Sequence, residues 1–155
     1  MRKDKLMERA VEIAQESAMG DGGPFGAIVV KDGKIISTGR NEVTAVNDPT
    51  AHAEMQAIRA ACRSLQSFQL SGCEIYTSCE PCPMCLSAIY WARPKAVYYA
   101  STKKEAAQIG FDDQFIYDQI ALPFEKRSIQ MMQICPDNHK LPFQTWKNSS
   151  HKTVY

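Results

Sequence analysis

The sequence predicts an α/β fold in which a mixed, five-stranded sheet is flanked by helices. Helical periodicity opens the chain, and two short apolar runs joined by a turn follow it. Two more helical stretches then alternate with apolar runs up to residue 100. The order to that point is α-β-β-α-β-α-β, and a last apolar run at 129–134 predicts the fifth strand.

The first helix and the hairpin follow from residue spacing and turn chemistry. The helix has one side of apolar and small residues, made of Leu6, Ala10, Ile13, Ala14 and Ser17. Such a helix covers one face of a sheet, and the turn residues at 21–24 end it. The run 25–30 returns as 34–38 through Asp32-Gly33, a pair that favours a tight hairpin turn.

Two helices in the middle of the chain begin at clear signals. Asn47-Asp48-Pro49-Thr50 predicts a turn and N-cap, which places His52 and Glu54 in the first helical turn that follows. The apolar positions of this helix are Ala51, Met55, Ile58, Ala61, Cys62 and Leu65. The second helix begins within 81–83, whose prolines suit a first turn, and stops before Arg93-Pro94.

The strands predicted at 73–78 and 96–100 flank the second of these helices. Because a helix connects them, they should be parallel. Past residue 100 the pattern weakens, although 105–109 predicts a helix. The tail, 136–155, is polar, and two aromatic residues can anchor a short helix in it. Such a tail can fray, dock on its own body, or dock on a partner subunit.

Two short motifs carry the chemistry: His52-Ala53-Glu54 and Pro81-Cys82-Pro83-Met84-Cys85. They supply one imidazole, two thiols and one carboxylate, and zinc readily takes imidazole and thiolate ligands in tetrahedral geometry. Three protein ligands leave a fourth position for water, which is typical of a catalytic site. The sequence therefore predicts a zinc site with His52, Cys82 and Cys85 as ligands.

Helical spacing assigns different tasks to these residues. An i, i+2 pair such as His52 and Glu54 does not share a helix face, so one side chain can bind metal while the other leans over a bound water. Cys82 and Cys85, at i, i+3, do share a face. In one alternative, Cys79 joins the three ligands in a closed, structural site. We expect Cys79 to point elsewhere because it precedes the helix start.

Composition limits the class of protein. The 155 residues form one predicted domain, with 45% hydrophobic residues and a net charge of +1. A protein that holds nucleic acid is more often basic, so we expect no nucleic-acid partner. No apolar run approaches the roughly 20 residues of a membrane span, and the N-terminus does not read as a signal peptide. Together with six cysteines and no secretion signal, this predicts a reducing, cytoplasmic setting.

The motifs resemble those of the cytidine-deaminase-like superfamily, and of its bacterial guanine deaminase branch in particular. H-x-E followed by P-C-x-x-C is the signature of zinc deaminases of nucleobases. The matching stretches cover nearly the whole chain and are 22–27, 47–54, 77–85, 89–94 and 110–113. The resemblance implies a three-layer α/β/α fold for a single domain, 1–155. It also implies a tail, 136–155, exchanged between the subunits of a homodimer.

The resemblance further implies the catalytic chemistry. One zinc ion per subunit would be bound by His52, Cys82 and Cys85, with a bound water or hydroxide as nucleophile. Glu54 would take a proton from that water and pass it to the purine ring. Asp113 would face the amino group and help to protonate departing ammonia. A loop turn or helix cap is the alternative role for Asp113.

Four more residues would bind the purine base. Asn41 would hydrogen-bond the purine edge, Phe25 would form an apolar wall, and Trp91 would lie near the pocket. Tyr155 would close the pocket of the partner subunit. From the residues alone, Asn41 can equally be a turn residue, Phe25 part of the core and Trp91 a packing residue.

Three functions are therefore compared. The resemblance favours hydrolytic deamination of guanine to xanthine and ammonia. A deaminase of cytosine or of adenosine in tRNA would use the same metal motif. A zinc-stabilised binding module without catalysis would keep the ligands but would not need Glu54.

Overall fold

The computed structural model describes residues 2–155. The chain divides into two compact units, the first ending at Gln114 and the second being Phe115–Tyr155. The first unit contains the sheet and both metal motifs.

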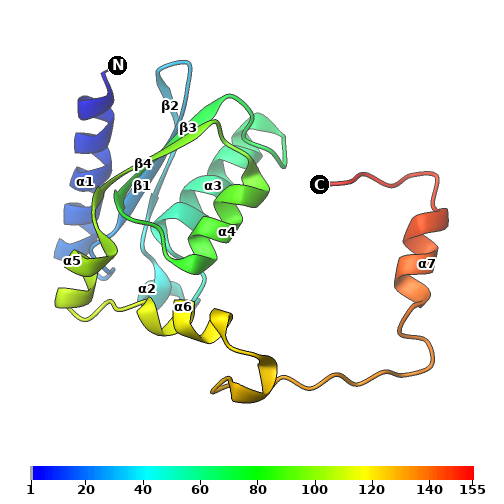
Figure 1. Cartoon of the computed structure of the whole chain (residues 1–155). Coiled ribbons are helices and arrows are strands. Elements are labelled where there is room, and N and C mark those ends of the chain that lie inside the picture. Colours follow the sequence, from blue (N-terminus) through cyan, green and yellow to red (C-terminus); the bar gives the residue numbers. More distant parts are fainter. Residues whose placement is uncertain (1) are drawn as a thin grey trace. The chain divides into compact units, whose positions relative to one another are not determined.

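The first unit is built on a mixed sheet with the strand order β2-β1-β3-β4 (Figure 1). Strand β1 (Gly26–Lys31) is antiparallel both to β2 (Lys34–Arg40) and to β3 (Cys73–Cys79), and β4 (Ala96–Ser101) is parallel to β3. The predicted parallel pair is thus confirmed. So is the hairpin turn, because Asp32 and Gly33 both have positive φ, as a type I′ turn requires.

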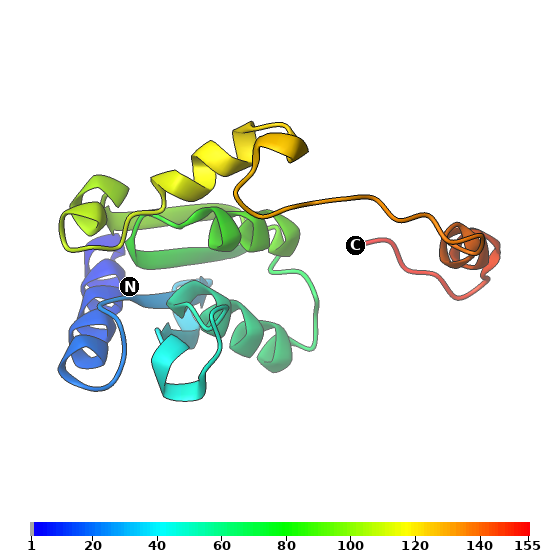
Figure 2. The same cartoon turned by 90° about the horizontal axis from the view of Figure 1, so that it is seen from below.

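Helices cover both faces of this sheet. In both views α1 (Lys3–Met19) lies on one side of the strands, and α3 (Ala53–Leu65) and α4 (Pro83–Ala92) lie on the other (Figures 1 and 2). The buried residues of α1 are Leu6, Ala10, Ile13, Ala14 and Ser17, the set predicted from spacing. The three-layer α/β/α arrangement is therefore confirmed, with one apolar core on each side of the sheet.

Among the described residues the sheet has four strands, so the predicted fifth strand is wrong. The segment 129–134 has no regular secondary structure and pairs with no strand, and Ile129 and Ile134 are strongly exposed. A strand is stable only where a neighbouring strand pairs with its backbone groups and one face is buried. Within the second unit this run has neither, so its apolar composition does not produce a strand.

The remaining helices are short. Helix α2 (Val43–Val46) follows β2 and α5 (Lys103–Gln108) follows β4, the latter close to the predicted 105–109. Helix α6 (Gln114–Ala121), the 3₁₀ turn η1 (Phe124–Lys126) and α7 (Leu141–Asn148) follow. The sequence predicted α7 but neither α2 nor α6. None of the described helices is both long enough and apolar enough to cross a membrane.

Candidate active site

The first metal motif lies where the chain enters α3. Asp48 accepts hydrogen bonds from the backbone N–H and the hydroxyl of Thr50, at 2.8 and 2.7 Å, which closes the predicted turn. The helix begins at Ala53, so His52 is its N-cap rather than a residue of its first turn. The His52 side chain makes no capping hydrogen bond. Its imidazole is therefore available as a ligand, while Glu54 lies in the first turn as predicted.

The second metal motif lies at the start of α4. Cys82 is the N-cap, and its Sγ accepts a hydrogen bond from the backbone N–H of Cys85 at 3.5 Å. Pro83 occupies the first turn, where its missing N–H has no cost. Pro81 precedes the N-cap, so only one of the two prolines lies in the helix as predicted. Cys82 and Cys85 thus both present their sulfur atoms at one helix N-terminus.

The two motifs converge on one point. His52 Nδ1 lies 3.5 Å from the Sγ of Cys82 and 3.5 Å from the Sγ of Cys85. A tetrahedral zinc ion, with Zn–S of about 2.3 Å and Zn–N of about 2.0 Å, separates sulfur and nitrogen ligands by roughly 3.5 Å. Borderline-soft sulfur and nitrogen donors at this spacing fit zinc. These three residues are the only group of candidate metal ligands found among the described residues.

Cys79 is not part of this group. Its Sγ points to the backbone carbonyl of Thr102 at 3.7 Å, away from the three ligands. Burial raises the pKa of the Cys79 thiol to about 11, so it stays protonated at neutral pH. The closed four-ligand site is therefore not formed by the described residues. A tetrahedral metal ion held by these three residues would keep one coordination position for water or substrate.

The three candidate ligands lie in short contact with one another, and these contacts shift their pKa values. A hydrogen bond from Cys85, followed by one from His52, holds the pKa of the Cys82 thiol well below its usual value. The same bond with Cys82, together with burial, raises the pKa of Cys85. The bond with Cys82 also raises the pKa of His52. One thiol of this pair is thus held toward the thiolate form, which metal binding requires.

Glu54 lies beside the metal ligands but is not one of them. Its side chain is 7% exposed, and Oε1 accepts a hydrogen bond from the Thr77 hydroxyl at 3.1 Å. The carboxyl group also interacts with the side chain of Cys85. Burial raises the pKa of Glu54, as expected for a carboxyl group that must exchange protons near neutral pH.

Asp113 comes from the segment between α5 and α6. It is half-buried, and burial raises its pKa, with a smaller contribution from the charge of Cys82. Asp113 directly precedes α6, and the backbone N–H of Gln114 donates a hydrogen bond to its neighbour Asp112 at 2.9 Å. Both roles of Asp113, in catalysis and as a helix cap, stay predictions.

Comparison with known proteins agrees with this geometry. Residues 1–101 match the family model for the cytidine and deoxycytidylate deaminase zinc-binding region. The chain belongs to this deaminase family. Guanine deaminase of Bacillus subtilis is 55% identical over 156 residues, which cover 100% of both chains. The crystal structure of that enzyme superimposes with a TM-score of 0.97 over 100% of this chain and 99% of the other.

Two more distant relatives share the domain. A guanine deaminase structure from Nitrosomonas europaea is 32% identical with a TM-score of 0.70, and covers 72% of this chain and 65% of the other. A tRNA-specific adenosine deaminase of Aquifex aeolicus is 42% identical over 105 residues, which are 68% of this chain and 70% of that protein. The family fold and zinc motif are thus shared by deaminases of different substrates.

In this deaminase Asn41 is buried, with its amide in a fixed orientation. Oδ1 accepts hydrogen bonds from the backbone N–H groups of Gly23 and Val43, at 3.4 and 3.2 Å. Only an oxygen can accept two such bonds, so Nδ2 is the end that can donate to a ligand. Asn41 therefore holds the turn at Gly23, as one of its two predicted roles requires, while its hydrogen bond to the purine edge stays a prediction.

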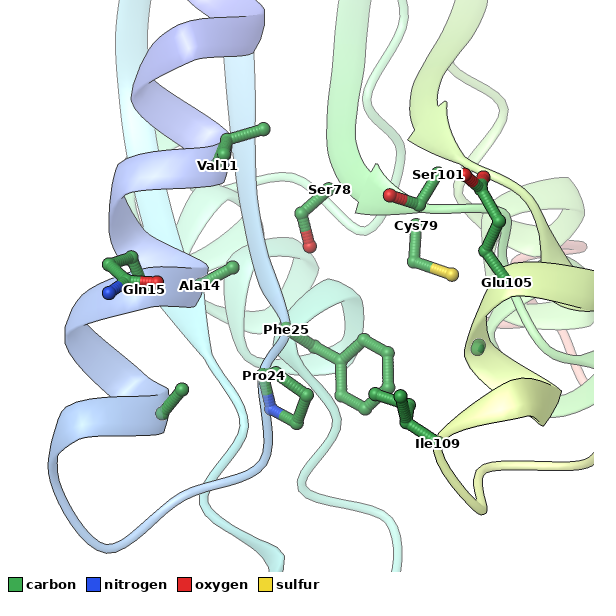
Figure 3. Close-up of a pocket in the computed structure, with 12 residues that line it drawn as sticks. Val11, Ala14, Gln15, Pro24, Phe25, Ser78, Cys79, Ser101, Glu105 and Ile109 are labelled. Carbon is green, nitrogen blue, oxygen red and sulfur yellow. The ribbon is translucent and has the colours of Figure 1, made fainter.

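Phe25 precedes β1 and has two kinds of contact. It packs against the core beneath α3 and α4, and its ring meets that of Phe111 edge-on, with centroids 5.0 Å apart. It also lines a pocket of about 260 Å³ between α1 and α5. Figure 3 shows its ring projecting into this space toward Cys79 and Ile109. The described lining residues include none of the three metal ligands, so this pocket is distinct from the metal site.

The two other predicted substrate residues are more exposed. Trp91 lies in the last turn of α4 and is 58% exposed. Tyr155 is the last residue of the second unit and is also largely exposed.

Thr77 contacts Glu54 but was not among the residues that the sequence predicted for the site. The sequence feature that could have indicated Thr77 is its hydroxyl group on the strand face that it shares with Cys73 and Ile75, which belong to the apolar core.

Proposed function

We propose that this protein is a zinc-dependent deaminase that hydrolyses guanine, so that guanine and water give xanthine and ammonia. The observation that carries this proposal is the full-length similarity to the Bacillus subtilis guanine deaminase. The family model ends at residue 101, but this similarity continues through Asp113 to the end of the chain. The part of the chain that distinguishes branches of the family is therefore included.

The metal site supports a hydrolytic reaction. His52, Cys82 and Cys85 would hold zinc, since their ligand atoms all lie within 4.8 Å of one another. Zinc, when bound, activates water as a nucleophile at neutral pH. The chain holds these ligands at the N-termini of two helices, and the partial positive charge of a helix N-terminus favours thiolates.

Glu54 and Asp113 would move the protons. Glu54 would accept the proton released as water adds to the amino-bearing carbon, and would deliver it to the purine ring. Its position in the first turn of α3 and its raised pKa suit both steps. Asp113, also with a raised pKa, would help to protonate the departing amine, which then leaves as ammonia.

The remaining residues would bind the purine. Nδ2 of Asn41 would donate to an acceptor on the purine edge, and a base that left this buried donor unpaired would lose binding. The ring of Phe25 would form an apolar wall of a purine pocket beside the metal site, separate from the cavity between α1 and α5, and Trp91 would lie near that purine pocket. The free base, rather than nucleic acid, is the proposed substrate, consistent with a net charge of +1.

A turnover assay tests the proposal. Zinc-loaded protein is incubated with guanine, adenine, cytosine and tRNA, and xanthine and ammonia are measured. We expect guanine to be converted fastest. Conversion of adenosine in tRNA in preference to guanine would replace this function with tRNA editing. No turnover of any substrate would favour the non-catalytic zinc module.

Glu54→Gln is the matched control for that assay. Glutamine keeps the shape of the side chain but cannot shuttle the proton, so kcat should fall by about 10²- to 10⁴-fold. Folding and zinc content should remain those of the wild-type protein. Full activity in this variant would contradict the proton-transfer role of Glu54.

We also propose that the protein is a homodimer, formed by a single domain, 1–155, whose tail, 136–155, docks on the partner subunit. Apolar side chains of the second unit are largely exposed, including Ile134 at 86% and Phe143 at 78%. Surfaces of this kind are normally covered by a partner. In this arrangement Tyr155 would close the partner's pocket and exclude water from the reaction. The six free cysteines suit a reducing, cytoplasmic setting.

Two experiments test the tail. Deleting 152–155 should reduce turnover far more than thermal stability, since a lid contributes little to the core. Mixing this truncated protein with Glu54→Gln should then restore part of the activity, because one subunit has an intact site and the other an intact tail. A monomer by analytical ultracentrifugation, or no restored activity, would contradict exchange.

A further inference from the structure

The middle strand of the sheet contains a buried hydroxyl group in an apolar layer. Thr77 lies in β3 and is 1% exposed. Alternation along the strand places it on the same face as Cys73 and Ile75, which belong to the core under α3 and α4. A hydroxyl group in such a layer costs free energy unless it is hydrogen-bonded. The contacts of Thr77 therefore need an explanation.

The Thr77 hydroxyl has two partners. Oγ1 lies 3.1 Å from Oε1 of Glu54 and 3.0 Å from the backbone carbonyl oxygen of Cys79. A hydroxyl group has one proton to donate and two lone pairs that accept. The carboxylate and the carbonyl compete for that one proton, so Thr77 is held between the Glu54 carboxyl group and the end of its own strand.

These contacts fix the carboxyl group of Glu54 from the sheet side. Oε1 is held by Thr77, while the same carboxyl group interacts with the side chain of metal ligand Cys85. Because β3 is paired with strands on both sides, Thr77 cannot easily move and is a rigid support.

We propose that Thr77 is a positioning residue for the reaction, which orients the Glu54 carboxylate toward the reacting water through its hydroxyl group. The inference rests on the proposed function, since it assigns Thr77 an effect on the proton-transfer residue of that reaction. Thr77 is not placed against the substrate. Its loss should therefore reduce kcat and leave KM nearly unchanged.

The competing explanation is purely structural. Thr77 could serve only to satisfy the carbonyl of Cys79 where β3 ends. In that case its removal would lower stability but would change kcat no more than the loss of any other buried hydroxyl. Ser78, the next residue, provides this comparison. It is also buried, and its Oγ accepts a hydrogen bond from the backbone N–H of Gly26 at 3.0 Å.

The experiment separates the hydroxyl group of Thr77 from its methyl group. Thr77→Val keeps the shape and loses the hydroxyl; Thr77→Ser keeps the hydroxyl and loses the methyl; Thr77→Ala loses both. Ser78→Ala is the matched control for a buried hydroxyl that does not touch Glu54. For each zinc-loaded protein, kcat, KM, zinc content and melting temperature are measured with guanine as substrate.

We expect the Val and Ala variants to lose about 10- to 100-fold in kcat, with KM and zinc content unchanged. The Ser variant should recover most of kcat although it is less stable than the wild-type protein. Ser78→Ala should lose stability alone.

Three results would overturn the inference. They are wild-type kcat in Thr77→Val, an equal loss of kcat in Ser78→Ala, and loss of zinc or of the fold in both hydroxyl-free variants. A wild-type protein that leaves guanine untouched would instead refute the proposed function.

Discussion

Gly39→Ala should damage the catalytic site by displacing the first turn of α3. Gly39 lies in β2, directly under the first turn of α3. A Cβ atom there would stand 2.1 Å from the carbonyl oxygen of Ala53 and 2.5 Å from the backbone nitrogen of Ala57. Both neighbours are backbone atoms, so no side chain can rotate away. The glycine is therefore what allows the helix to approach the strand.

The size of the effect follows from these distances. Ordinary van der Waals contact begins at 3.4 Å, so the 2.1 Å approach requires the strand and helix to separate by the difference, about 1.3 Å. Overpacking of this kind costs about 1 to 3 kcal/mol of unfolding free energy. Glu54 lies in the displaced turn, and a misplacement of about 1 Å can cost roughly 10²-fold in rate. Both stability and kcat should fall.

The assay combines denaturant unfolding with steady-state kinetics on guanine. Gly72→Ala is the control, because Gly72 has φ +76° and a Cβ atom there would meet nothing within 4 Å. It should cost about 1 to 2 kcal/mol through backbone strain and leave kcat unchanged. Wild-type kcat in Gly39→Ala would refute the reasoning, as would a kcat loss in Gly72→Ala as large as that in Gly39→Ala.

Three further predictions concern the metal ligands and Asp113. Cys82→Ser should remove most bound zinc and lower the melting temperature, because metal binding contributes to folding; elemental analysis and calorimetry measure the two effects. Asp113→Asn should lower kcat by about 10²-fold or more without loss of zinc, since the amide cannot donate an acidic proton, and steady-state kinetics check this. Zinc affinity should weaken as pH falls from about 8 to about 5.5, because protons compete for the ligands. The pKa of His52 is raised by its bond with Cys82, so this competition should begin at a higher pH than for an ordinary histidine, and chelator titration at several pH values measures it.

The fold up to residue 101 could be predicted because local and global signals agree there. The predicted inner side of α1 is the buried one, and Asp32-Gly33 forms the tight turn that its residue types favour. The prediction of a strand at 129–134 was wrong because apolar composition alone does not provide a neighbouring strand to pair with. Helix α6 (Gln114–Ala121) was missed although it is no shorter than α7, which two aromatic residues of the tail indicated.

The site was only partly predictable, and the limit has a physical reason. His52, Cys82 and Cys85 were found because metal ligands require particular residue types at particular spacings. Thr77 was missed because threonine is a common strand residue, and its β-branched shape gives no sign of the bond that it makes. Which residue supports another depends on contacts across α3 and β3, and spacing along the chain does not contain that information.

An N-cap position places one candidate metal ligand from each motif. His52 and Cys82 are each the N-cap of a helix, with extended φ and ψ angles, and each lies at the positive end of that helix. An N-cap side chain is oriented by the point at which the helix begins, so two helix starts fix two ligands without further packing. Cys85 and Glu54 then follow within the first turns. The close approach of α3 to Gly39 sets where one of these helix starts lies. A change in strand β2 can therefore alter the metal site although β2 contributes no ligand, which is why Gly39→Ala tests the architecture as well as the chemistry.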